Sequence, residues 1–320
     1  ISKMTKNNTF LNEVRHGLSQ PSKYLPSHYF YDPAGDKLFQ QIMEMPEYYL
    51  TDSELEIFRD QSENVIKSFG LKKNEDFELI ELGAGDGKKT QHLLKALLNE
   101  GYQFSYCPVD ISSNSLEMIT TRMQKLFPTL EIKPKQGDYF HVLDDFFTSK
   151  KAKVILFIGS NLGNMSDELA TTFLGNVAQN LKSGEKLLLG LDLIKSKDIV
   201  FPAYADAAGI TSKFNLNLLK RINSELGGNL IIENFEHAPE YSEKEGIAKS
   251  YLKSKVQQTV YISDLDQSFD FDANELIHTE ISRKYNDEIL QSLLQNSNLK
   301  ISHQFLDSKK YFADYILTKS

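Results

Sequence analysis

The sequence predicts an α/β fold in which a mostly parallel sheet ends in an antiparallel hairpin, together with a second segment of mixed α+β structure. Short β-rich runs alternate with amphipathic stretches between residues 79 and 193, which is the pattern of a parallel sheet covered by helices. The first β-rich run leads directly into a glycine-rich corner. At residues 301–319, two β-like runs follow each other without an intervening helix, as in an antiparallel hairpin.

The individual elements follow from hydrophobic periodicity. Buried parallel strands are short apolar runs, and the sequence predicts strands at residues 77–82, 103–111, 130–139, 153–160 and 185–194. Apolar residues spaced three and four apart predict helices at residues 116–127 and 167–181. In the closing hairpin, the polar stretch from Asp307 to Lys310 is expected to form the turn.

Two stretches interrupt this alternation and predict a second domain. Residues 1–60 are rich in Tyr, Phe and Pro, and residues 200–285 combine a helix-prone stretch with strand-like runs. A chain of 320 residues is also long enough for two hydrophobic cores. We therefore expect a cofactor-binding α/β domain formed by residues 61–198 and 286–320, and a substrate-binding domain formed by residues 1–60 and 199–285.

Composition and charge favour a small-molecule substrate. The net charge is -8 and the pI is about 5.5, and the sequence contains no local basic groove, so we expect no nucleic-acid partner. No apolar run is long enough to cross a membrane, and the N-terminal residues lack the hydrophobic region of a signal peptide. We expect a cytoplasmic protein with no membrane partner, and we infer no obligate protein partner.

Cysteine and histidine give no sign of a metal site. The single Cys107 excludes an intrachain disulfide and a cysteine-rich metal centre, which suits a reducing compartment. His92, His237 and His278 have no acid or second ligand at a metal-binding spacing, so we interpret them as structural or surface residues. The sequence therefore predicts a site without a metal ion.

The glycine-rich corner indicates the type of cofactor. Gly83, Gly85 and Gly87 follow the first strand, but Lys88 stands where the dinucleotide fingerprint G-x-G-x-x-G has its third glycine. A pyrophosphate needs that close backbone approach, whereas S-adenosylmethionine has no phosphate and offers a carboxylate to backbone amides. The closing hairpin is likewise typical of methyltransferases that use S-adenosylmethionine. A nicotinamide-dependent oxidoreductase is the alternative that stays open.

Two later strand ends fit the same cofactor. Asp110 lies 25 residues after Gly85 at the end of the second strand, where a carboxylate can accept from a ribose diol. Asp138 and Tyr139 end the third strand, where a carboxylate could bind an adenine amino group and a ring could stack on adenine. A tight turn or a helix cap would explain each feature alone. Their occurrence in order on successive strands favours a cofactor pocket.

The sequence also resembles the histidine Nα-methyltransferase family of the ergothioneine pathway, whose members trimethylate the α-amino group of L-histidine to give hercynine. The resemblance extends over almost the whole chain. It is carried by YDPAGDKLFQQI (31–42), MPEYYLTDSE (45–54), IELGAGDGKKT (80–90), PVDIS (108–112), FIGSNLGNM (157–165), LLLGLDLIK (187–195), AYADAAGITSKFNLNLLKRINSEL (203–226) and HTEISRKY (278–285). It implies a Rossmann-like class I methyltransferase sheet and S-adenosyl-L-methionine as the cofactor.

The resemblance further implies a set of site residues. For the cofactor it implies Tyr31, Gly83, Gly85, Lys89, Asp110, Asp138 and Tyr139. Around the α-amino and α-carboxylate groups of the substrate it implies Asn164 and Tyr204 as the catalytic residues. Around the imidazole it implies Tyr48, Glu280 and Ser282, with Phe39 lining the same pocket.

Physical chemistry supports the imidazole assignment. Glu280 can accept from one ring nitrogen, and the hydroxyl of Ser282 can serve the other because it works as donor or acceptor. Their i, i+2 spacing places both side chains on one face of a strand. A hydrogen bond to a charged group contributes roughly 1.5–3 kcal/mol, which separates histidine from phenylalanine or leucine.

Other interpretations stay open from the sequence. Glu280 and Ser282 could lie on a solvated edge strand, and Asn164 could cap the following helix. Tyr204 and Tyr48 could be core aromatics. The acceptor could be another amino acid or an indole-type amine, as in fungal alkaloid N-methyltransferases of the family. The protein could also bind the cofactor without catalysis.

Overall fold

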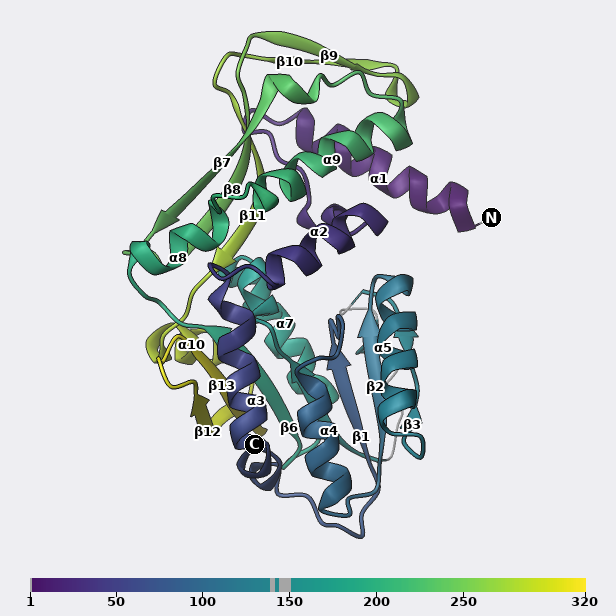
Figure 1. Ribbon diagram of the computed structural model, residues 1–320, viewed down its shortest axis with the longest axis vertical. Helices are drawn as coiled ribbons and strands as arrows, with labels where there is room; N and C mark the ends of the chain where they lie inside the picture. The colour runs from purple at the N-terminus through teal and green to yellow at the C-terminus, as the bar shows by residue number, and fades with distance from the viewer. Residues whose placement is uncertain (1, 139–141, 144–150) are drawn as a thin grey trace. The chain divides into compact units, whose positions relative to one another are not determined.

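The computed structural model describes residues 2–138, 142–143 and 151–320, and the chain divides into two units (Figure 1). Unit 1 consists of Ile1–Tyr48 and Lys195–Ser282, and unit 2 consists of Tyr49–Ile194 and Arg283–Ser320. The chain therefore passes from one unit to the other at residues 48–49, 194–195 and 282–283. The assignment of cofactor and substrate binding to separate domains stays a prediction.

A mixed sheet forms the centre of unit 2. Its strands follow the order β12-β13-β6-β5-β1-β2-β3, and β4 also pairs with β2. The bounds are β1 Phe77–Leu82, β2 Phe104–Asp110, β3 Glu131–Ile132, β4 Lys135–Gln136, β5 Ala152–Phe157, β6 Lys186–Asp192, β12 Leu299–Leu306 and β13 Phe312–Lys319. The pairs among β1 to β6 are parallel, whereas β13 pairs antiparallel with both β6 and β12. The predicted sheet of parallel strands with a C-terminal antiparallel hairpin is thus confirmed.

Helices cover both faces of this sheet (Figure 1). Successive side chains of a strand point to opposite faces, so each strand contributes to two apolar layers. One layer packs against α3 Tyr49–Ser68, α4 Thr90–Asn99 and α5 Ser113–Leu126, and the other against α7 Asp167–Asn180 and α10 Asp287–Leu294. Burial on both faces explains why the strands read as continuous apolar runs in the sequence.

Two predicted strands are interrupted or end early. Residues 130–139 contain two short strands, β3 and β4, because Pro134 between them has no backbone N–H to donate. β5 ends at Phe157, and Gly159 and Ser160 then take left-handed φ values of 72° and 57°. A serine in this region is strained, and strained residues cluster at functional sites. The turn carries the chain to the edge of the sheet where the parallel strands end.

Unit 1 combines helices with antiparallel strands, which is the predicted α+β composition. Its helices are α1 Ser2–Leu18, α2 Pro33–Met43, α8 Lys197–Tyr204 and α9 Ile210–Leu226, with 3-10 turns at η1 Ser27–Phe30, η3 Ile232–Asn234 and η4 Ser263–Leu265. Its strands are β7 Phe235–Ser242, β8 Ile247–Ser254, β9 Gln258–Ile262, β10 Gln267–Phe271 and β11 Leu276–Arg283. They form one sheet of order β11-β8-β7 and a separate β10-β9 pair. Phe214, Leu218 and Ile222 of α9 are buried in the core of this unit.

The stretch YDPAGD, which carries part of the resemblance, begins α2 and fastens it to α9. Asp32 caps the helix, since its Oδ1 accepts from the Gly35 amide at 2.7 Å. The same oxygen accepts from Asn217 Nδ2 of α9 at 2.9 Å. A Cβ atom at Gly35 would lie 1.7 Å from the Phe30 carbonyl oxygen, so only glycine fits there. This motif therefore supports the core of unit 1.

Candidate active site

The glycine-rich corner is anchored on the sheet and open on its other side. Gly83 and Gly85 have left-handed φ values of 74° and 56°, which glycine adopts without steric cost. The amides of Gly83 and Ala84 both donate to the Val109 carbonyl, at 2.8 and 3.1 Å, which ties the corner to the end of β2. A Cβ atom at Gly85 would meet no heavy atom of the described residues within 4 Å. The corner therefore has room for a ligand beside Gly85.

Asp110 lies directly beside this corner, as the sequence predicts for a ribose-binding carboxylate. It is the last residue of β2 and is only partly buried. Its Oδ2 accepts from the Gly85 amide at 3.1 Å, and its Oδ1 accepts from the Ser112 amide at 2.9 Å. A carboxylate has about four lone-pair positions and is a group to which a ribose diol can donate. The two backbone amides also fix the orientation of the Asp110 side chain.

The third predicted cofactor position is described only in part. Asp138 follows β4 and is exposed, and its carbonyl accepts from the Val142 amide at 3.0 Å. Tyr139 lies outside the described residues. The backbone of β4 pairs with the end of β2 through Asp110 and Gln136. Asp138 and Asp110 therefore follow neighbouring strands at the same edge of the sheet.

Lys89, which the resemblance assigns to the cofactor, contacts a carboxylate of its own unit. Its Nζ donates to Glu54 of α3, whose side chain is fully buried, while the Lys89 side chain is 21% exposed. The Glu54 carboxylate also accepts from the Gly159 amide, with N···O distances of 2.8 and 3.0 Å. Burial acts to lower the pKa of Lys89, but the charge of Glu54 and its hydrogen bond raise it above the usual value. Lys89 is therefore held in its charged form by Glu54.

A second buried carboxyl group lies beside Glu54. Asp314 of β13 is fully buried, and burial together with the negative charge of Glu54 raises its pKa well above the usual value. Gly190 of β6 makes room for both groups, because a Cβ atom there would lie 2.2 Å from Glu54 Oε1 and 3.0 Å from Asp314 Oδ1. The sequence does not predict this cluster. Glu54 belongs to the motif MPEYYLTDSE, which was the only available signal.

Asn164 reaches the same edge of the unit 2 sheet. It ends the 3-10 turn η2 Asn161–Asn164, which follows the strained turn after β5. Its side chain is exposed, whereas the neighbouring Leu162 and Gly163 are buried. Ligands of doubly wound sheets bind beyond the carboxyl ends of the strands, which is where this turn lies. The amide can accept from an amine and donate to a carboxylate.

In unit 1, two predicted substrate residues hydrogen bond to each other. The Tyr204 hydroxyl, at the end of α8, donates to Ser282 Oγ of β11 at 2.8 Å. Both side chains are buried, with 7% of each exposed. His237 Nε2 lies 2.8 Å from the Tyr204 carbonyl oxygen, and burial lowers the pKa of this histidine. These contacts hold the end of α8 against the sheet of unit 1.

Glu280 occupies the same strand two residues before Ser282. Residues two apart on a strand project from the same face, so Glu280 and Ser282 share a face of β11. Thr279 points to the opposite face, where its hydroxyl donates to Asn215 Oδ1 at 2.9 Å inside the core. Glu280 is half-buried. The face of β11 that carries Glu280 thus differs from the face that forms the core of unit 1.

Three further predicted residues form one aromatic cluster in unit 1. The ring of Phe39 lies 5.5 Å from that of Tyr31 and 6.4 Å from that of Tyr48, both edge-on. Phe214 of α9 completes the cluster at 5.9 Å from both Phe39 and Tyr31. Tyr31 was assigned to the cofactor and the other two to the substrate, yet all three share one cluster. The sequence does not single out Phe214, although this residue lies within the motif at residues 203–226, which contains α9.

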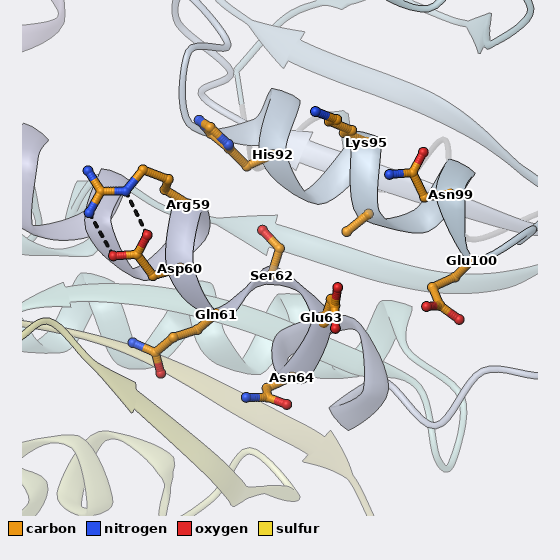
Figure 2. A pocket seen from close by; sticks show the side chains of 11 residues that line it. Arg59, Asp60, Gln61, Ser62, Glu63, Asn64, His92, Lys95, Asn99 and Glu100 are labelled. Carbon is orange, nitrogen blue, oxygen red and sulfur yellow. Dashed lines mark hydrogen bonds and ion pairs between the residues drawn. The ribbon is translucent and has the colours of Figure 1, made fainter.

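A separate pocket of about 420 Å³ lies between α3 and α4 of unit 2 (Figure 2). Its lining is polar and charged and consists of Arg59, Asp60, Gln61, Ser62, Glu63, Asn64, His92, Lys95, Ala96, Asn99 and Glu100. Arg59 and Asp60 face each other across two hydrogen bonds of 2.6 Å (Figure 2). None of these lining residues belongs to the predicted site. The pocket is therefore distinct from the candidate active site.

Comparison with known proteins decides the family. The family described as "Histidine-specific methyltransferase, SAM-dependent" matches residues 10–319 of the chain. The chain belongs to this family. A cofactor without a pyrophosphate is consistent with Lys88 standing where the dinucleotide fingerprint has its last glycine. S-adenosylmethionine is thus the cofactor, and the nicotinamide alternative is wrong.

Individual relatives agree with this membership. The chain is 33% identical to histidine N-alpha-methyltransferase of Mycolicibacterium smegmatis, over 92% of its own length and 90% of that protein. It is also 33% identical to histidine N-alpha-methyltransferase of Mycobacterium tuberculosis, over 90% and 88% of the two chains. L-tryptophan methyltransferase of Psilocybe serbica is 26% identical over 93% of this chain and 90% of that protein. The chain is therefore an enzyme, a methyltransferase of this histidine-specific family with a small-molecule substrate.

Across the described residues, no helix of the enzyme is long and apolar enough to cross a membrane. This finding agrees with the sequence, in which charged residues make up 25% of the chain.

Proposed function

We propose that this enzyme methylates the α-amino group of L-histidine with S-adenosylmethionine and that repeated transfers give the trimethylated betaine hercynine. The observation that carries the proposal is the hydrogen bond between Tyr204 and Ser282. It joins a residue expected at the amine to one expected at the imidazole, within unit 1. Glu280 on the same face of β11 adds the carboxylate that an imidazole N–H requires.

The residues of unit 2 fit the cofactor. A Cβ atom at Gly85 would meet no heavy atom of the described residues within 4 Å, and the Asp110 carboxylate beside it is a group to which the two hydroxyls of a ribose can donate. The residues proposed to hold the cofactor are Tyr31, Gly83, Gly85, Lys89, Asp110, Asp138 and Tyr139. When bound, S-adenosylmethionine supplies the methyl group as an electrophilic sulfonium. Lys89 keeps its positive charge through Glu54 and can attract the cofactor carboxylate.

Recognition of the imidazole is assigned to Glu280 and Ser282, with Tyr48 and Phe39 beside the ring. A half-buried carboxylate selects a substrate that carries an N–H group, because a substrate without one leaves the charge desolvated and unpaired. Ser282 Oγ accepts from the Tyr204 hydroxyl, and because a serine hydroxyl can both donate and accept, we assign Ser282 to the second ring nitrogen. The neutral tautomer of histidine, with one donor and one acceptor nitrogen, matches this pair.

Positioning and deprotonation of the amine are assigned to Asn164 and Tyr204. The amine attacks with its lone pair, so an ammonium group must first lose a proton. Neither Asn164 nor Tyr204 carries a negative charge at neutral pH that would stabilise the ammonium form, and its proton can pass to water. The Tyr204 hydroxyl donates to Ser282 Oγ, and a phenolic oxygen is also an acceptor type that suits an amine N–H. Alignment of two bound reactants contributes about 7–11 kcal/mol to such a transfer.

Mass spectrometry of the products tests the proposed function. The enzyme is incubated with S-adenosylmethionine and L-histidine, and in parallel with L-tryptophan and L-phenylalanine. We expect trimethylated histidine, with mono- and dimethylated forms as transient species, and no methylation of phenylalanine. Methylated tryptophan without methylated histidine would contradict the acceptor assignment and place the enzyme beside its 26% identical tryptophan-methylating relative.

A further inference from the structure

The chain crosses from one unit to the other at three points, which we call passages. Close to each passage in the sequence lies a polar residue of unit 2. The passages lie at residues 48–49, 194–195 and 282–283. Tyr49 follows the first passage directly, Asp192 precedes the second by two residues, and Lys284 follows the third by one residue. These three residues are far apart in the sequence. The methyltransferase reaction described above does not use them.

The three side chains form one buried cluster, which we name the passage cluster. Lys284 Nζ lies 2.8 Å from Asp192 Oδ2, and the Tyr49 hydroxyl donates to the same oxygen at 2.8 Å. Lys284 and Asp192 are both 0% exposed. Charges this deeply buried are costly unless they are paired and hydrogen bonded. Their geometry is therefore specific, because a shift of either residue leaves a charge unpaired.

Backbone hydrogen bonds extend the passage cluster. The Tyr285 amide donates to the Asp192 carbonyl, and the Ile194 amide donates to the Tyr285 carbonyl, both at 2.8 Å. These bonds join the chain before the second passage to the chain after the third as a short parallel bridge at Leu193 and Tyr285. The three passages are thus fastened to one another within unit 2 by side chains and by backbone.

The turn that carries Asn164 is attached to the same place. The Asp192 amide donates to Ser160 Oγ at 3.0 Å, and Ser160 is the strained residue that begins this turn. A Cβ atom at Gly163 would lie 2.6 Å from the Arg283 carbonyl oxygen, so the turn packs closely on the backbone beside Lys284. The position of Asn164 therefore depends on the residues around Asp192 and Lys284.

We infer that Tyr49, Asp192 and Lys284 are positioning residues for the amine acceptor. Tyr48 directly precedes Tyr49, Ser282 lies two residues before Lys284, and Asn164 lies on the turn held by Asp192. All three neighbours are proposed substrate residues, so the inference rests on the proposed function. The cofactor corner at Gly83 and Gly85 is fastened to Val109 and Asp110 instead. Loss of the passage cluster is thus expected to affect the acceptor and to spare the cofactor.

The inference is tested with Tyr49→Phe, which removes one hydroxyl and keeps the ring that lies edge-on to Tyr311 at 5.5 Å. Kinetics with each substrate varied in turn give KM and kcat, and calorimetry gives the affinity for S-adenosylhomocysteine. We expect kcat/KM for histidine to fall about tenfold, as for loss of one hydrogen bond to a charged group. The affinity for S-adenosylhomocysteine should stay within about twofold of the wild type, as for substitutions distant from a site.

A matched control and a second variant complete the test. Tyr315→Phe also removes a tyrosine hydroxyl that donates to a carboxylate in unit 2, Asp287 Oδ1 at 2.7 Å, but neither residue belongs to the passage cluster. It should leave both substrates unaffected. Asp192→Asn keeps an oxygen acceptor but loses the charge, and it should weaken histidine use more than Tyr49→Phe if it folds. The thermal midpoint is measured for every variant.

The outcomes separate the inference from the proposed function. If the wild type methylates histidine but Tyr49→Phe behaves like Tyr315→Phe, the inference is wrong. Equal losses for histidine and for S-adenosylhomocysteine, or a lower thermal midpoint with unchanged kinetics, would mean that the cluster has a structural role only. If the wild type methylates a different amine, the proposed function is wrong, and the same comparison is made with that amine.

Discussion

Tyr204 and Ser282 are 78 residues apart in the sequence, yet the hydroxyl of one donates to the hydroxyl of the other at 2.8 Å within unit 1. The bond fixes the direction of the Tyr204 hydroxyl, whose oxygen is proposed to accept from the amine. Because Ser282 shares its strand face with Glu280, the same bond also connects the proposed amine and imidazole contacts. A change in either hydroxyl is therefore expected to affect histidine use and not cofactor binding.

Tyr204→Phe should lower kcat/KM for histidine by about 10- to 100-fold, because removal of one partner leaves Ser282 buried without its donor. The affinity for S-adenosylhomocysteine should not change. Steady-state kinetics and calorimetry check both expectations. Tyr241→Phe is the matched control, since its hydroxyl donates to the Lys195 carbonyl at 3.0 Å in the same unit. Similar kinetics for the two variants would show that the Tyr204 hydroxyl has no part in the reaction.

Glu280→Ala should weaken histidine binding by about 10- to 100-fold, the range for a hydrogen bond to a charged group. Maximal turnover at saturating histidine should fall less, because the methyl-accepting amine is not the group that Glu280 binds. Calorimetry with histidine and S-adenosylhomocysteine measures the affinity directly. Thr279→Ser on the opposite face of the strand keeps its hydroxyl and serves as the control. Equal histidine affinity in the wild type and Glu280→Ala would reject the imidazole assignment.

Asp110→Asn should weaken binding of S-adenosylhomocysteine by about tenfold, since a neutral amide accepts more weakly than a carboxylate. The amide oxygen can still accept from the Gly85 amide, whereas the Ser112 amide loses its carboxylate acceptor. Calorimetry with S-adenosylhomocysteine provides the measurement. Asp307→Asn is a suitable control because Asp307 also accepts from backbone amides, at Tyr311 and Phe312, in the turn of the closing hairpin. An unchanged affinity in Asp110→Asn would remove Asp110 from the cofactor site.

Glu81→Gln should change the pH dependence of stability. Burial raises the pKa of Glu81 from 4.5 to about 7, although hydrogen bonds from Thr90 and Tyr106 partly oppose the shift. A raised pKa in the folded state means that its stability contribution is complete below pH 4.5 and is lost as the pH rises to about 7. The loss is on the order of 3 kcal/mol.

Urea unfolding at several pH values checks this prediction. The difference in unfolding free energy between the wild type and Glu81→Gln isolates the titration of Glu81 from that of other groups. It should change in favour of the glutamine variant between pH 4.5 and about 7 and stay constant above that range. A difference that does not vary with pH would mean that the pKa of Glu81 is the same in the folded and the unfolded protein.

The cofactor side of the site could be predicted because its determinants are local. Gly83, Gly85 and Asp110 follow two apolar runs, and the ends of neighbouring parallel strands meet at one edge of a sheet. Position in the sequence therefore nearly specifies position in space. Pro134 is also a local feature of the sequence. We nevertheless predicted one strand at residues 130–139, and the structure has two short strands there.

The buried polar clusters could not be predicted for a physical reason. Glu54, Asp192 and Lys284 are 0% exposed, but charged side chains in a sequence are normally interpreted as solvated. Their burial is possible only because partners from distant segments neutralise them, as Lys89 does for Glu54 and Lys284 for Asp192. No spacing rule relates such partners, since each pair joins different elements.

By itself the sequence determined the alternation of strands and helices, the glycine corner, the closing hairpin and the family, because hydrophobic periodicity and contiguous motifs are properties of neighbouring residues. Tertiary structure alone decided that Lys89 donates to Glu54, that Tyr204 donates to Ser282, and that Asp192 binds both Tyr49 and Lys284. These contacts depend on chain segments that meet only after folding. Which groups pair is decided by the free-energy cost of burying an unpaired charge or hydroxyl, and no local sequence pattern encodes that cost.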